Sequence, residues 1–138
     1  MADYTMSITT SRPYDETVTA VREQLAEAGF GVLTEIDIKA TLKAKLDVDV
    51  APQVILGACR PQLAHRALEV EPSIAALLPC NVVVRSTADG TVVEAFDPQA
   101  MMSFAGDGAA GEALRTVASD ARERLSAALT ALNKEEED

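Results

Sequence analysis

The sequence predicts an α+β fold, specifically a two-layer sandwich in which a mostly antiparallel sheet of about five strands carries helices on one face. Stretches of alternating or β-branched residues recur between stretches whose apolar residues have helical spacing. An Asp-Gly pair at residues 89–90 separates two strand-like stretches and favours a hairpin turn. The longest helical pattern comes last, at residues 114–132, where a final helix can cover the sheet.

The length and composition predict a single domain. The chain has 138 residues, of which 48% are apolar, and this is enough for one core without disulfides or metal. No repeat or linker divides the sequence. The domain is therefore expected to span residues 1–138 and to end in a frayed acidic tail at residues 134–138.

Two strands and a helix are expected in the first forty residues. Residues 4–10 alternate between apolar and polar side chains, which is typical of a strand with one buried face. Residues 13–28 carry apolar side chains at spacings of four and three, so they predict an amphipathic helix, and Gly29 fits a left-handed cap at its end. Residues 30–38 alternate again. The residues expected to share one side of this second strand are Phe30, Val32, Thr34, Ile36 and Ile38.

The middle of the chain predicts a strand, a helix and a further strand. Residues 54–59 form a short apolar run typical of a buried strand, within which Gly57 indicates a bulge or a close backbone approach. Residues 61–70 begin with a proline, which the first turn of a helix tolerates. Residues 80–84 are β-branched enough to form the next strand. Before this unit, residues 39–46 are expected to form only one or two exposed helical turns.

Charge and composition argue against several partners. The chain has 22 acidic and 12 basic residues, and its formal charge of −10 repels nucleic acids and anionic membranes. The N-terminus lacks the basic and apolar regions of a signal peptide, and no apolar run is long enough to span a bilayer. A cytoplasmic protein is therefore expected, in which Cys59 and Cys80 are reduced thiols.

Three segments of the sequence resemble a known family. They are ILGACRP at residues 55–61, HRALEVEP at residues 65–72 and LLPCNVVV at residues 77–84. This combination is similar to the signature of the domain of unknown function 302 family, a group of small bacterial and archaeal proteins. The resemblance covers about residues 4–102. It implies an α+β fold and a homodimer, and it implies no established activity.

Two residues depart from the pattern of that family. Arg60 stands where the family usually has Asn, and Ala75 stands where Gly is common. An Asn before a helix is a good N-cap, so its loss costs about 1 kcal/mol. The change also places a cation beside Cys59.

The two cysteines are candidates for thiol chemistry. Cys59 lies next to a predicted helix N-terminus and to Arg60, an environment that favours a reactive thiolate. Free cysteines are also among the most buried residues, and both Cys59 and Cys80 lie at apolar strand ends. A buried structural role is therefore the competing interpretation.

The single histidine, His65, is a candidate metal or haem ligand. It falls on the polar side of the 61–70 helix, where the simplest interpretation is a solvated imidazole beside Glu69. In a two-fold dimer each residue occurs twice, so two His65 side chains could hold one metal ion or one haem iron. Met101, Met102 and Phe104 could then form apolar walls. Glu35 and Asp37 share a strand face but lack a third ligand, so they are interpreted as solvated.

The sequence thus predicts a small cytoplasmic homodimer that binds a ligand, with haem bound at the dimer interface through His65 as the leading hypothesis. The first alternative is a thiol-redox or thiol-transfer protein that uses Cys59 and Cys80. The second alternative is a non-catalytic interaction module. Because no complete catalytic motif is present, enzymatic activity is left open.

Overall fold

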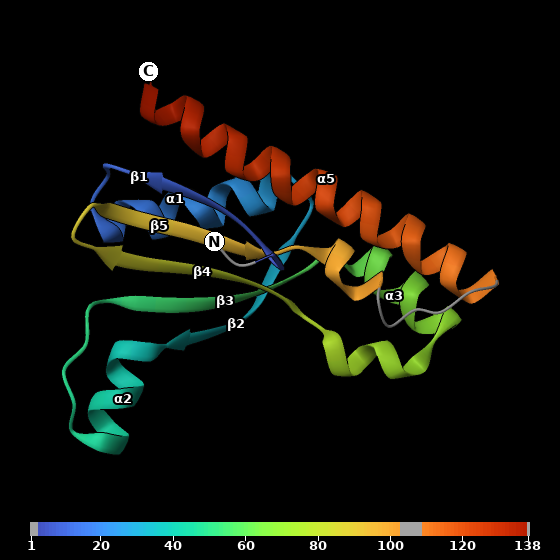
Figure 1. Cartoon of the computed structure of the whole chain (residues 1–138), viewed down its shortest axis with the longest axis horizontal. Coiled ribbons are helices and arrows are strands. Elements are labelled where there is room, and N and C mark those ends of the chain that lie inside the picture. The colour runs from blue at the N-terminus through green and yellow to red at the C-terminus, as the bar shows by residue number, and fades with distance from the viewer. Residues whose placement is uncertain (1–2, 103–108, 138) are drawn as a thin grey trace.

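The computed structural model describes residues 3–102 and 109–137 of the chain (Figure 1). Strands alternate with helices, and two short 3₁₀ helices, labelled η, connect them. None of the described helices is long and apolar enough to cross a membrane. The elements are β1 (Thr5–Thr10), α1 (Tyr14–Glu27), β2 (Gly31–Asp37), α2 (Ile38–Leu46), β3 (Gln53–Cys59), α3 (Pro61–Val70), η1 (Pro72–Leu77), β4 (Cys80–Thr87), β5 (Gly90–Phe96), η2 (Pro98–Met101) and α5 (Ala109–Glu137).

In the described part of the chain, five strands form one sheet in the order β1-β5-β4-β3-β2. Each neighbouring pair is antiparallel, and the predicted hairpin joins β4 to β5, with Thr87 opposite Gly90. Helices α1 and α5 lie together over one face of this sheet (Figure 1). The predicted α+β sandwich with helices on one face is therefore confirmed.

The main core fills the space between the sheet and the two helices α1 and α5. Leu25 of α1, Leu56 of β3 and Leu125 of α5 are almost fully buried there. Burial of each such side chain contributes about 1.5–3 kcal/mol. The apolar seam predicted for the last helix is confirmed, because all of its members are buried. They are Leu114, Ala118, Ala121, Leu125, Ala128 and Leu132.

The end of α1 is closed as Gly29 predicted. Gly29 adopts a positive φ of 91°, and its N–H donates to the Ala26 carbonyl at 3.0 Å. The N–H of Phe30 donates to the Leu25 carbonyl at 2.9 Å, which completes a Schellman motif. This cap turns the chain sharply and places Phe30 in the core before β2 begins.

The sequence predicted that Val32 and Ile36 share one face of the second strand, and this prediction was wrong. A bulge shifts the β2–β3 register between Val32 and Thr34. Val32 packs against the core, whereas Ile36 pairs with Ile55 on the face that the helices leave open, and Ile36 is 46% exposed. One extra residue in a strand interrupts its period of two, so the side chains that follow change face. Leu33, at the bulge, is 64% exposed.

Helix α2 is longer than the one or two turns expected, although its exposure is confirmed. Its nine residues follow directly from β2, and no residue of the helix is buried. The Asp37 carboxylate caps it by accepting from the Ala40 N–H at 2.9 Å. Glu35 pairs with Arg22 of α1 at 2.6 Å. These two carboxylates thus hold helices in place, one as a cap and one as an ion-pair partner.

The close approach predicted at Gly57 is also confirmed. A Cβ atom at this position in β3 would collide with Oγ1 of Thr34 and would lie 2.8 Å from Cγ of Pro79. Thr34 of β2 and Pro79 can therefore approach β3 this closely only because residue 57 has no side chain.

Candidate ligand pocket

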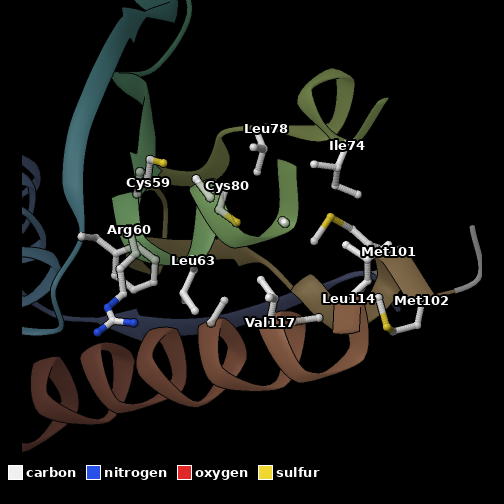
Figure 2. A pocket seen from close by; sticks show the side chains of 16 residues that line it. Cys59, Arg60, Leu63, Ile74, Leu78, Cys80, Met101, Met102, Leu114 and Val117 are labelled. Carbon is white, nitrogen blue, oxygen red and sulfur yellow. The ribbon is translucent and has the colours of Figure 1, made fainter. Parts of the chain in front are cut away.

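A second apolar cluster lies beyond the end of the sheet, where α3, η1 and η2 face the first turns of α5 (Figure 1). Between this cluster and the ends of β3 and β4 is a cavity of about 40 Å³. Of the residues that the structure describes, sixteen line the pocket, and Arg60 is the only one of these with a charged or polar side chain. All the others are apolar residues or cysteines (Figure 2).

Local sequence explains how α3 forms one wall of the pocket. Pro61 occupies the first helical position, and the Arg60 carbonyl accepts the first bond, from the Leu63 N–H at 3.0 Å. The side chain of Arg60 makes no capping bond, as the missing Asn predicted. Leu63 and Ala67, one turn apart, are buried and face the pocket.

The Arg60 side chain reaches the last helix and not the neighbouring thiol. Its Nη1 lies 3.2 Å from Oδ2 of Asp120, and only 19% of the side chain is exposed. The other oxygen of Asp120 accepts from Nε of Arg124 at 3.2 Å, and Nη1 of Arg124 donates to the Ala28 carbonyl at 3.1 Å. Two guanidinium groups therefore share one carboxylate at this end of the pocket.

Both predicted cysteines line the pocket, and both are free thiols. Burial raises the pKa of the Cys59 thiol. Burial, with a smaller contribution from the nearby Cys59, raises the pKa of Cys80 to about 11. The expectation that Arg60 favours the Cys59 thiolate is not met, because the guanidinium binds Asp120 and desolvation dominates. Both thiols are thus neutral at neutral pH, whereas thiol chemistry needs the thiolate.

The residues predicted around the haem site fall in different places. Met101 and Met102 line the pocket, and Phe104 lies outside the described residues. His65 lies on the other side of α3, where its side chain is 78% exposed and its Nε2 is 3.6 Å from Oε1 of Glu69. The predicted solvated pairing with Glu69 is confirmed. Within one chain the two methionines and His65 do not share a site.

The described part of the chain contains no preformed metal site. There, no group of three or more His, Cys, Asp or Glu residues is placed to hold a metal ion. A metal bound through His65 therefore needs ligands from a second copy or from outside the protein.

Sequence reasoning missed the wall that α5 contributes and the charged cluster at its edge. Arg60 and Asp120 are 60 residues apart, and no sequence pattern connects them. The only local signal was that Leu114 and Ala121 continue the apolar seam of the last helix, which is longer than the sheet it covers. The part of α5 that extends beyond the sheet forms this wall of the pocket.

The fold and the pocket define a small α+β protein with helices on one face of an antiparallel sheet and an apolar pocket beyond the sheet's end. The chain belongs to the family described as Domain of unknown function DUF302, whose model matches residues 6–132. It is similar to an uncharacterized conserved protein of this family from Bacillus stearothermophilus, known from a crystal structure. The two chains are 31% identical, and the match covers 94% of this chain and 98% of that one with a TM-score of 0.83. No curated protein matches the chain.

Proposed function

We propose that this protein binds a small apolar ligand in the pocket between α3, η1, η2 and α5. The observation that carries the proposal is the lining, in which one charged residue accompanies fifteen apolar residues and cysteines. Ligand sites in proteins are typically concave and apolar, with a few placed polar groups. The proposal is one of binding, because burial raises the pKa of both thiols in the pocket and so disfavours the reactive thiolate.

The size of the cavity limits the ligand and requires its walls to move. About 40 Å³ is well below the roughly 150 Å³ of an engineered cavity that binds benzene. Met101 and Met102 have unbranched, adaptable side chains, and they stand at the end of the short helix η2, of which Met101 is the last residue. We expect the side chains of Met101 and Met102 to move and enlarge the cavity when a ligand enters.

Thermal unfolding with and without 1-octanol tests the proposal. The alcohol is expected to raise the unfolding midpoint of the native protein and not that of Ala64→Leu, which fills the pocket from α3. Ala127→Leu is the matched control, since it makes the same change at an exposed position of α5 that lies outside the pocket and outside β2 and α2. Equal stabilisation of both variants would show that the alcohol binds elsewhere.

We also propose that the functional unit is a homodimer formed through β2 and α2. The support is the exposed edge strand β2 together with four large apolar residues around it, Leu33, Ile36, Leu46 and Val48, which are 41–66% exposed. Helix α2 has nine residues and none of them is buried, whereas isolated helices shorter than about 12–15 residues are marginal in water. Contact with a second copy would bury the exposed apolar side chains of this segment and stabilise its helix.

Charge favours self-association at the same surface. Residues 31–50 carry four acidic and three basic side chains, so this surface is nearly neutral in a chain whose formal charge is −10. Two copies repel each other least where this segment meets its equivalent. The exposed backbone of β2 is also self-complementary under a two-fold axis.

Haem binding through His65 is a second candidate, because the imidazole is 78% exposed and accessible to an iron atom. It requires a dimer that brings two α3 helices together, in addition to or in place of the β2 surface. Hemin titration of the native protein and of His65→Ala tests it. A Soret band that appears in the native protein and not in His65→Ala, with about one haem per two chains, would support this candidate. Identical spectra of the two proteins would rule out haem binding through His65.

A thiol-redox or thiol-transfer role is the other alternative, because Cys59 and Cys80 lie together in the pocket. Alkylation with iodoacetamide at pH 7.5, followed by mass spectrometry, separates it from simple ligand binding. Neutral thiols react slowly, so both cysteines are expected to be modified mainly after denaturation. Rapid modification of one cysteine in the native protein would favour thiol chemistry.

A further inference from the structure

We infer that the ligand of this pocket carries a carboxylate, which Arg60 binds, in addition to an apolar chain. The inference rests on the proposed function and specifies the chemical class of the ligand. It depends on three features of the pocket: the position of Arg60, the charge around it, and the number of hydrogen bonds that it leaves open.

The position of Arg60 gives the pocket two different ends. Figure 2 shows Arg60 at one end, next to α5, with Met101 and Met102 towards the other end and Leu63 between them. A molecule lying along this apolar path would place one terminus at the guanidinium group. A ligand with a single polar terminus matches that arrangement.

The charge at this end is incompletely balanced. Arg60 and Arg124 contribute two positive charges, and Asp120, which contacts both, contributes one negative charge. Because the Arg60 side chain is 19% exposed and those of Asp120 and Arg124 are 36% and 37% exposed, water screens the excess positive charge only in part. An anion at this point is attracted, although the chain as a whole is strongly acidic.

The guanidinium group of Arg60 also has N–H donors that Asp120 does not use. Within the described residues it makes one side-chain hydrogen bond, to Asp120, out of the five N–H donors that the group offers. A carboxylate accepts two parallel bonds from such a planar group. A single carboxylate also neutralises the one excess charge, whereas a phosphate near its dianionic form would leave a surplus of negative charge.

Calorimetric titration with octanoate and with 1-octanol tests the inference, because the two molecules share the same chain. In the native protein octanoate is expected to bind at least about tenfold more tightly, as a charge-assisted hydrogen bond predicts. Arg60→Gln is expected to abolish this preference and to leave the binding of 1-octanol within about threefold. Arg66→Gln is the matched control, because it removes the same charge from an exposed position on α3.

A second variant makes the opposite change. Asp120→Asn removes the carboxylate that competes for Arg60, so octanoate is expected to bind more tightly and 1-octanol is expected to bind as before. This result does not depend on how well Arg60→Gln folds.

The outcomes separate this inference from the proposed function. Equal affinities of the native protein for octanoate and 1-octanol would overturn the carboxylate assignment and leave the apolar pocket in place. Equal losses of octanoate binding in Arg60→Gln and Arg66→Gln would also overturn it, since overall charge would then explain the preference. Failure of both molecules to bind the native protein would overturn the inference and the proposed function together.

Discussion

Arg60 at the start of α3 contacts Asp120 in the middle of α5, with 3.2 Å between Nη1 and Oδ2. This contact joins two helices that are far apart in sequence, and it lies at the edge of the apolar pocket. The same carboxylate binds Arg124, which in turn donates to the end of α1. One acidic residue therefore connects three helices and leaves one positive charge in excess beside the pocket.

The Arg60–Asp120 pair is expected to contribute little to stability. Asp120 is 36% exposed, and ion pairs of this kind contribute about 0–1 kcal/mol. Asp120→Asn should therefore lower the free energy of unfolding by less than about 1 kcal/mol in urea denaturation. A loss of about 3–5 kcal/mol, which is typical of a broken buried pair, would indicate a structural role in place of ligand binding.

The buried Cys80 thiol should make stability depend on pH in the alkaline range. Its pKa is about 11 in the folded chain, against an ordinary value of 9.0, so folding favours the neutral thiol. This contribution is complete below about pH 9 and is lost as the pH rises towards 11, because the unfolded state releases its proton first. Its size is about 2–3 kcal/mol.

Urea denaturation at pH 8 and pH 10.5 measures that contribution if the native protein is compared with Cys80→Ala. The variant should lose less stability between the two pH values, and the difference isolates residue 80 from other groups that titrate in this range. Identical losses in both proteins would mean that Cys80 is exposed or ionised in the folded chain.

Gly57 is expected to tolerate no side chain. In Gly57→Ala the new methyl group would collide with Thr34 and Pro79, and the strain should cost about 1–3 kcal/mol or more. Gly31→Ala in β2 is a matched control, because its methyl group would meet only the Cys59 carbonyl at an ordinary 3.8 Å. Comparable unfolding midpoints for the two variants would contradict the close packing of β2 on β3.

The proposed dimer surface can be tested at Leu33. Leu33→Lys should weaken self-association by at least about a hundredfold, since each of two copies loses a buried leucine and gains a charge. Tyr4→Lys alters a similarly exposed apolar residue that lies outside β2 and α2, and should leave the dimer intact. Light scattering after size-exclusion chromatography gives both masses. A native protein that is monomeric, or a dimer unaffected by Leu33→Lys, would exclude this surface.

Local sequence patterns were sufficient for most of the elements and insufficient for the site. The seam of α5, the cap at Gly29 and the hairpin before Gly90 depend on residues close in sequence, so their patterns predicted them. The bulge in β2 could not be predicted, because the sequence alternates through it and only pairing with β3 shows the extra residue.

The site depends on contacts between distant segments. Cys59 and Met101 were both singled out as candidates, but nothing local indicates that they line one pocket. Nothing in the sequence indicated that Arg60 binds Asp120. Because of this contact, Arg60 does not stabilise the thiolate of Cys59 as the sequence had suggested. His65, whose environment is set by its own helix, was placed correctly on the solvated side.

The central claim is that a small apolar ligand enters the pocket, and methionine methyl NMR during a titration with 1-octanol tests it most directly. Met101 and Met102 line the pocket, whereas Met6 packs against the main core between the sheet, α1 and α5. The account predicts that the methyl signals of Met101 and Met102 shift in a saturable manner and that the Met6 signal does not. Signals that stay unchanged, or a Met6 signal that shifts as much as the other two, would contradict it.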